Sequence, residues 1–282
     1  MTIAVSGDSI TFNDLSVQAS AQVGMKNRII DGGFIINQRG YVSAANLGAG
    51  GYGHDRWKGG VAATNTYTFT QGALGVNTTV TITAGTLVQV IEGCNLAEGG
   101  TYVLSWTGTA QGRLNGGTYG ASGTVTVTEW VAGTNLNVEF NTGTVGSIQL
   151  EKGSTATSFD YRDYGRELIM CQRYCLVDTN EGGLYVTFAS GTASSTTGFA
   201  ARRFLPVTMR AIPSLVTNGA GNFLADQGNV APVVTGITLS NSSTKIVSLA
   251  VTVASGLTGG SAVSLVSDGL TALRSLTYSA EI

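Results

Sequence analysis

The chain has 282 residues, a length that fits about two domains. Only 11 % of the residues are charged and the formal net charge is −2, so no basic surface argues for nucleic-acid binding. Glycine is abundant at 40 residues, yet no apolar run approaches the roughly 18 residues that a membrane span requires, and no membrane insertion is expected.

The cysteines indicate a reducing compartment. Cys94, Cys171 and Cys175 are odd in number and lack the spacing of a disulfide scaffold. Residues 1–5 lack the positive and apolar regions of a secretory signal. Cys171 and Cys175 lie four residues apart, but no further metal ligands are evident nearby, so buried free thiols are predicted. No metal or other cofactor is expected.

Residues 1–25 are predicted to form an N-terminal arm. They carry few large apolar side chains, and the short alternation at Ile10, Phe12, Leu15 and Val17 cannot build a core alone. We expect a neighbouring protein to order this segment, with these four residues making the contact. A disordered tail is the alternative.

A period of two dominates residues 26–162, which are predicted to be one domain. Glycine- and asparagine-rich turns separate short runs in which apolar and polar residues alternate. The apolar members of these runs are Val80, Ile82 and Ala84; Tyr102, Leu104 and Trp106; Val125 and Val127; Leu136, Val138 and Phe140; and Ile148 and Leu150. Evenly spaced short strands of this kind predict a β-sandwich or jelly roll.

A linking helix is predicted within residues 163–178. Asp163 is its expected N-cap, and the following residues include a stretch without glycine or proline. On such a helix Leu168, Cys171 and Cys175 would share one face.

Alternation returns after the helix. Leu184, Val186 and Phe188 alternate with other residues, and so do the valines and leucine of residues 247–253. Residues 179–282 are therefore predicted to be a β-rich C-terminal domain, a second β-sandwich, and the whole chain is expected to be all-β.

Three stretches resemble a recurrent module of bacteriophage tail-fibre and virion proteins. They are Asn27–Gly40 with Tyr52–Trp57, then Gln149–Arg162 leading into Cys171–Tyr174, and Phe204–Pro213. The opening Ile10–Gln18 is similar to the attachment arm of tail fibres. The resemblance implies a jelly-roll domain similar to carbohydrate-binding modules, a β-rich distal domain and, in many members, a homotrimer.

One polar and aromatic cluster could bind a sugar. Such a site needs flat aromatic faces with carboxylates and guanidinium groups to bond hydroxyls. Tyr52, Asp55, Arg56 and Trp57 supply these types and are candidate ligand-binding residues. The favoured alternative is structural, with Asp55 and Arg56 anchoring a loop or ion-pair network and Trp57 filling a core.

Other candidates stand outside that cluster. Trp130 follows Glu129 at a strand end and could be an exposed glycan platform. Gln38 and Arg39 could reach a ligand but are expected to bridge to another loop or protomer.

No catalytic constellation is evident. Glycoside hydrolysis needs two carboxylates at a defined separation, and the acidic residues are scattered. Ser-His-Asp chemistry would have to use His54, the only histidine, without a G-x-S-x-G motif. A calcium clamp is common in similar modules, but no D-x-D-x-D-G loop supports one. The chain is expected not to be an enzyme.

The leading hypothesis is a phage virion structural protein, a tail fibre or fibre-like module made in the host cytoplasm. It would attach to the host surface by multivalent binding, with sister chains, other tail, neck or capsid proteins, and a host glycan or protein as partners. The alternative is a purely structural collar, hub or capsid-decoration fibre. A small tail-spike enzyme that degrades polysaccharide is a third possibility.

Overall fold

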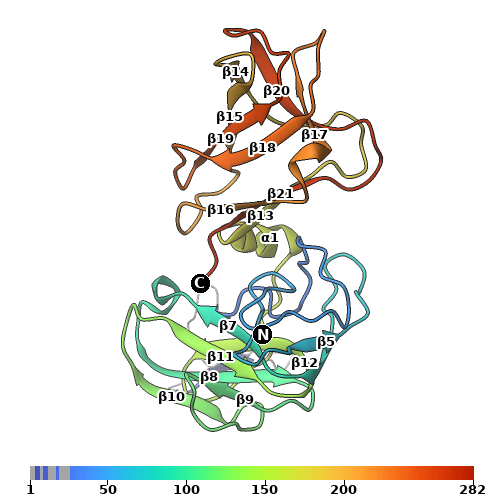
Figure 1. The fold of residues 1–282 in the computed structure, drawn as a ribbon. Coiled ribbons are helices and arrows are strands. Elements are labelled where there is room, and N and C mark those ends of the chain that lie inside the picture. The colour runs from blue at the N-terminus through green and yellow to red at the C-terminus, as the bar shows by residue number, and fades with distance from the viewer. Residues whose placement is uncertain (1–3, 7–8, 12–16, 19–25) are drawn as a thin grey trace.

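The computed structural model describes residues 4–6, 9–11, 17–18 and 26–282. The regular secondary structure of this part of the chain consists mainly of antiparallel β-strands, and α1 (Tyr164–Gln172) is its one α-helix. Figure 1 shows two β domains with α1 between them and the C-terminal residue at their meeting point. The all-β prediction is confirmed.

Three short strands precede the domains. They form an antiparallel sheet of β1 (Ala4–Ser6), β2 (Ser9–Thr11) and β3 (Val17–Gln18). Of the predicted attachment residues, Ile10 lies in β2 and Val17 in β3, whereas Phe12 and Leu15 fall outside the described residues. Their role in docking stays a prediction.

The first domain is a β-sandwich of two sheets. The larger has the order β10-β8-β12-β6-β5 and the smaller β4-β7-β11-β9. Their strands are β4 (Lys58–Gly59), β5 (Thr66–Thr68), β6 (Val80–Ala84), β7 (Leu87–Ile91), β8 (Gly100–Thr107), β9 (Gly112–Leu114), β10 (Val125–Trp130), β11 (Leu136–Phe140) and β12 (Gly143–Lys152), with the 3-10 turn η1 (Gly93–Leu96) after β7.

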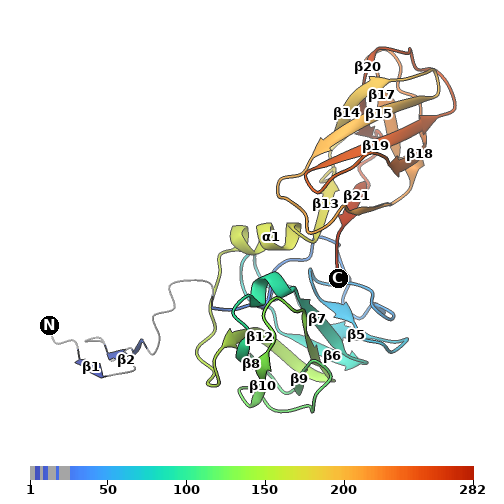
Figure 2. The ribbon, with the colours of Figure 1, turned by 90° about the vertical axis from the view of Figure 1, so that its left-hand side faces the viewer.

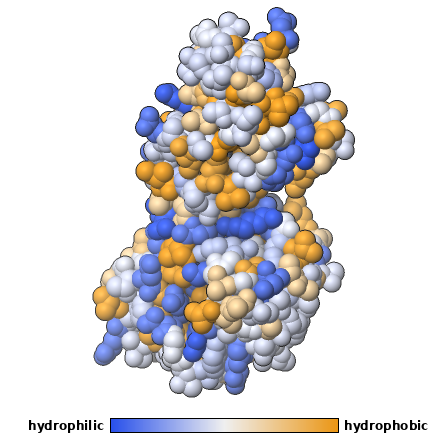
Figure 3. All heavy atoms as spheres, viewed as in Figure 1, coloured by the Kyte–Doolittle hydropathy of each residue, from blue (hydrophilic) through white to orange (hydrophobic). Residues whose placement is uncertain are grey.

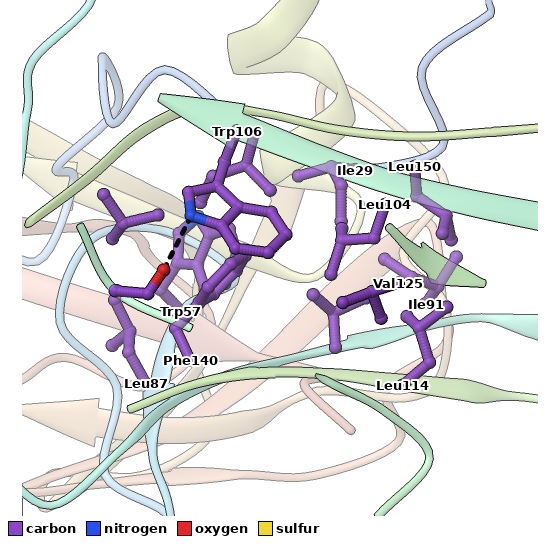
Figure 4. Close-up of a cluster of buried hydrophobic side chains, with 14 of the residues drawn as sticks. Ile29, Trp57, Leu87, Ile91, Leu104, Trp106, Leu114, Val125, Phe140 and Leu150 are labelled. Atoms are coloured by element: carbon purple, nitrogen blue, oxygen red, sulfur yellow. Dashed lines mark hydrogen bonds between the residues drawn. The ribbon is translucent and has the colours of Figure 1, made fainter. Parts of the chain in front are cut away.

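The core of this domain follows from the period of two. Alternate residues of a strand point to opposite faces, so Leu136, Val138 and Phe140 of β11 all enter the core and are fully buried. Trp106 of β8 packs edge-on to Phe140, and its indole Nε1 donates to the Ala110 carbonyl at 2.9 Å (Figure 4). Each fully buried side chain of this size contributes about 1.5–3 kcal/mol.

Side-chain amides fasten the segment that precedes these strands. The Asn27–Gly40 stretch is not a strand. Instead, the buried Gln89 donates to the Ile30 carbonyl at 2.7 Å and accepts from the Ile30 N–H at 2.9 Å. Asn27 likewise donates to the Ile148 carbonyl at 2.9 Å. These bonds satisfy buried polar backbone groups that would otherwise be costly.

The N-terminus of α1 is as predicted. Asp163 is the N-cap, and its carboxylate accepts from the Arg166 N–H at 2.9 Å. Cys171 of α1 and the following Tyr174 pack with Ile30 and Ile36 of the first domain in a separate buried cluster.

The prediction for the C-terminal part of the helix is wrong. The helix ends at Gln172, and Cys175 opens β13 (Cys175–Thr179), so Cys175 shares no helix face with Cys171. The cause is tertiary, because β13 pairs along its whole length with β21 (Ser275–Ser279). Both thiols are free and buried, as predicted.

The second domain is also made of two sheets. One has the order β17-β20-β14-β15-β19-β18, and the other, β13-β21-β16, rises from α1 (Figure 2). The remaining elements are β14 (Thr187–Ala193), β15 (Gly198–Phe204), β16 (Ser214–Thr217), η2 (Ala220–Asn222), β17 (Phe223–Asp226), β18 (Val234–Leu239), β19 (Ile246–Val253) and β20 (Ala262–Ser267). An isolated bridge between Leu224 of β17 and Val233, the residue before β18, brings the two ends of the six-stranded sheet together.

One predicted strand in this domain starts late. Leu184 is 52 % exposed and lies before β14, which begins only at Thr187. Glu181, Gly182 and Tyr185 adopt positive φ, a conformation that extended strands exclude.

Candidate functional site

Trp57, a candidate sugar platform, lies in the core of the first domain. It is 0 % exposed, and its ring lies 5.2 Å from that of Phe34 and 6.1 Å from that of Phe140. Its Nε1 donates to the Asp31 carbonyl at 2.9 Å. The indole is therefore covered on both faces and corresponds to the structural alternative.

Asp55 and Arg56 belong to a polar interface between the two domains, which we call the joint. It consists of Gln38, Arg39, Tyr52, Asp55, Arg56 and Glu92 from the first domain, Arg173 and Tyr174 from just after the end of α1, and Arg210, Glu281 and Ile282 from the base of the second domain. In Figure 3 a band of hydrophilic residues crosses the molecule between the two domains.

Arg56 is the centre of the joint. Its side chain is 2 % exposed and lies with its guanidinium carbon 3.6 Å from the centre of the Tyr174 ring. One terminal nitrogen donates to the Glu281 carboxylate and the other to the Val90 carbonyl at 2.6 Å. Arg39 bonds the second Glu281 oxygen at 3.1 Å. Two arginines of the first domain thus share one carboxylate of the second.

The neighbouring contacts complete this interface. The Gln38 side chain donates to the Cys175 carbonyl at 2.8 Å. The Tyr52 hydroxyl donates to the Ile282 carbonyl at 2.6 Å, and the Arg39 guanidinium lies 5.0 Å from the Tyr52 ring. Gln38 and Arg39 therefore bridge to another part of the same chain.

Burial shifts the pKa of Asp55. Loss of water raises this pKa to about 6, although Arg39 and the Gln38 side chain lower it. A raised folded-state pKa makes Asp55 a source of stability at acidic pH, and that stability is lost as the pH rises from about 4 through about 6. The neighbouring His54 changes stability with pH in the opposite direction, because burial lowers its pKa.

His54 should stay uncharged well below neutral pH. Burial lowers its pKa to about 4, while the Gln71 side chain opposes the shift. The unfolded chain takes up a proton below about pH 6.5 and the native chain does not, so this group lowers the unfolding free energy by about 3 kcal/mol as the pH falls from about 6.5 to about 4. Since His54 is the only histidine, an NMR titration of its ring protons measures the pKa directly. His54→Gln assigns the signal, and a midpoint near 6.5 would contradict the expectation.

Trp130 is not brought together with the other candidates. It ends β10 in the five-stranded sheet, is half-buried, and donates its Nε1 to the Thr134 carbonyl at 3.2 Å. The other four candidates, Tyr52, Asp55, Arg56 and Trp57, lie on the side of the four-stranded sheet and the joint. The five candidates therefore do not form one site.

A groove of about 500 Å³ lies on the outer face of the four-stranded sheet. Its walls include the glycine-rich segments around residues 49–50 and 59–61 and the turn at Gly116. Its floor consists of side chains that alternate with core residues along the strands, namely Lys58, Val88, Val90, Arg113, Asn137 and Glu139. Its volume is within the range of ligand sites, roughly 300–1,000 Å³.

Strand register sets the order of these floor residues. Lys58 pairs with Val88, Val88 with Glu139, and Glu139 with Arg113, so the four side chains form one row across four strands. Val90 pairs with Asn137 in the next row. An apolar strip therefore separates Lys58 from the charged pair at the other end.

The charged pair is held in a fixed geometry. Arg113 donates from Nε to Glu139 at 2.9 Å, and the Tyr119 hydroxyl donates to the other Glu139 oxygen at 3.0 Å. The Arg113 guanidinium lies 4.5 Å from the Tyr119 ring. Burial, followed by the charge of Glu139, raises the pKa of Tyr119 to about 12. The side chains of Arg113 and Glu139 remain 29 % and 17 % exposed, so a ligand can reach them.

This groove suits a ligand rich in hydroxyl groups. Glu139 can accept, Arg113 and Lys58 can donate, and Asn137 can do both. Val88, with the largely buried Val90 near it on β7, offers an apolar surface between Lys58 and Glu139. Among the described residues that line the groove, Glu139 alone carries a carboxylate.

Sequence reasoning missed this site, although a signal was present. In the β7 segment the inward position holds the polar Gln89, while the outward positions hold Val88 and Val90. Apolar residues on the outer face of an antiparallel strand mark a surface that contacts something. Its polar end could not be found in this way, because the pairing of Arg113 with Glu139 depends on register.

The described residues offer few other kinds of site. They contain no group of three or more histidine, cysteine, aspartate or glutamate side chains placed to hold a metal ion. Within the same residues, no helix has the length and apolar character to cross a membrane.

Comparison with known proteins leaves the family of this two-domain all-β chain open. No family model matches it, and the searches of curated proteins and of solved structures return no match.

Proposed function

We propose that this chain is a bacteriophage virion structural protein, a tail fibre or fibre-like module, that attaches to the host surface by binding a glycan in the groove on the four-stranded sheet. The groove carries the proposal, because it combines an apolar strip with fixed hydrogen-bonding groups at a volume suited to a short oligosaccharide. The three stretches that resemble phage fibre modules support the virion part.

The structural roles of those stretches also support a separate ligand surface. Trp57 fills the core and Arg56 holds the joint, while Arg162 of the second stretch pairs with Glu167 of α1 at 2.8 Å. A module whose motif residues maintain its fold can present different outer surfaces to different receptors. In a homotrimer, three weak contacts would combine into strong attachment.

Glu139→Gln should weaken glycan binding tenfold or more. The change removes the charge that orients Arg113 and Tyr119, and a hydrogen bond to a charged group contributes about 1.5–3 kcal/mol. The measurement is a microarray of bacterial surface glycans, followed by titration calorimetry with any oligosaccharide that binds.

Glu129→Gln is the matched control, because Glu129 is exposed in the same domain and does not line the groove. Equal binding by the wild type and both variants would reject the groove as the site. If the wild-type protein bound no glycan on the array, the result would contradict glycan attachment and favour a purely structural role.

A further inference from the structure

A second hollow lies in the second domain, where β13 faces β14 and β15. Its volume is about 370 Å³, and its lining residues are Asp178, Thr179, Thr187, Phe188 and Arg203. None of these residues belongs to the groove or the joint. It is therefore an independent feature of the distal domain.

An oriented ion pair forms the polar wall of this hollow. Arg203 donates from Nε and Nη2 to the two oxygens of Asp178, at 2.7 and 2.9 Å. Its remaining terminal nitrogen donates to the Phe204 carbonyl at 2.6 Å. The side chains of Arg203 and Asp178 are 33 % and 16 % exposed, so both are held in place and still accessible. The pair is neutral overall, and each partner keeps unused hydrogen-bonding capacity.

A buried hydroxyl points to a ligand at this place. Tyr278 of β21 is 0 % exposed, and its hydroxyl has no hydrogen-bond partner among the described residues. Tyr278 pairs with Leu176, and Asp178 lies two residues further along β13, so the phenol and the Asp178 carboxylate lie on the same face of this sheet. Burial and then the charge of Asp178 raise the pKa of Tyr278. Buried polar groups are normally paired, and an unpaired one is costly to the fold.

We propose that the hollow binds one neutral sugar residue. Adjacent hydroxyls of a sugar can donate to Asp178 and accept from Arg203, and the Tyr278 hydroxyl gains a partner. Thr179 and Thr187 add hydroxyls at the rim, and Phe188 supplies an apolar wall for a C–H face of the ring. The neutral pair does not favour a charged ligand. The choice of a sugar rests on the proposed attachment function, whereas the existence of a polar site does not.

The decisive variant is Tyr278→Phe, which removes only the unpaired hydroxyl. The probes are methyl glycosides of neutral hexoses, 6-deoxyhexoses and N-acetylhexosamines, measured on the full chain by saturation-transfer NMR and titration calorimetry. Tyr278→Phe should weaken binding at least tenfold while the melting temperature stays equal or rises. Asp178→Asn should weaken it as well. Tyr185→Phe, in an exposed loop of the same domain, should bind as the wild type does.

The outcomes separate this site from the groove. Binding lost in Tyr278→Phe but kept in Glu139→Gln supports the proposal, even if the groove proves to bind nothing. Binding kept in Tyr278→Phe but lost in Glu139→Gln overturns it and leaves the groove as the site. Failure of every probe to bind the wild type, or a Tyr278→Phe protein that is less stable than the wild type, also overturns it.

Discussion

Trp57→Ala should lower the unfolding free energy of the first domain by about 3–5 kcal/mol, the cost usual for truncating a large buried aromatic side chain. The indole lies close to Phe140 in the centre of the sandwich (Figure 4). It also contacts Phe34, and its N–H satisfies the Asp31 carbonyl. The substitution therefore leaves both a cavity and an unpaired buried acceptor. Differential scanning calorimetry measures the loss as a lower melting temperature.

Trp130→Ala is the control for that experiment. Trp130 is only partly buried at a sheet edge, and its loss should shift the melting temperature much less. If Trp57→Ala melted at the wild-type temperature, the assignment of Trp57 to the core would be wrong. The expected result also means that loss of glycan binding in Trp57→Ala would follow from unfolding and would not identify a contact.

Glu281→Gln should loosen the connection between the two domains. Glu281 is the common partner of Arg39 and Arg56, and the side chains of Glu281 and Arg56 are 5 % and 2 % exposed. Removing one member of a buried ion pair leaves an uncompensated charge and costs about 3 kcal/mol or more. Small-angle X-ray scattering should show a broader distribution of interatomic distances, and calorimetry should show the two domains melting further apart.

Glu98→Gln provides the matched comparison. Glu98 also pairs with an arginine, Arg28, but it lies within one domain and its side chain is 47 % exposed. Exposed pairs contribute about 0–1 kcal/mol, so this variant should resemble the wild type in both measurements. Identical scattering and melting of the two variants would show that Glu281 does not hold the joint.

A stable joint has a consequence for attachment, if both proposed sites bind sugars. The groove lies on the first domain and the hollow on the second, and the joint holds the two domains in one arrangement. Two weak sites at a fixed distance bind a repeating polysaccharide more strongly than either alone, provided that the repeat matches their separation. Glu281→Gln should then reduce polysaccharide binding without affecting single sugars.

Local patterns were sufficient for much of the fold. Alternation predicted the strands around Leu104, Val138 and Leu150, because a sandwich buries one side of each strand. Asp163 marked the start of α1, because a cap acts within one turn of the helix. Both features leave a pattern within a few consecutive residues, so they can be read without knowing which distant segments pack against them.

Sequence alone also determined the all-β class and the types of residue available for binding, since each follows from composition and short periods. Tertiary structure decided everything that joins distant segments. Cys175 lies in a strand and not in the helix, because β21 near the end of the chain pairs with that strand. Arg56 belongs to the joint because it pairs with Glu281, and Glu139 pairs with Arg113 because of the register between β9 and β11. Such partners meet only in the folded chain. A local alternation of apolar and polar residues predicts a strand but does not specify which distant strand pairs with it.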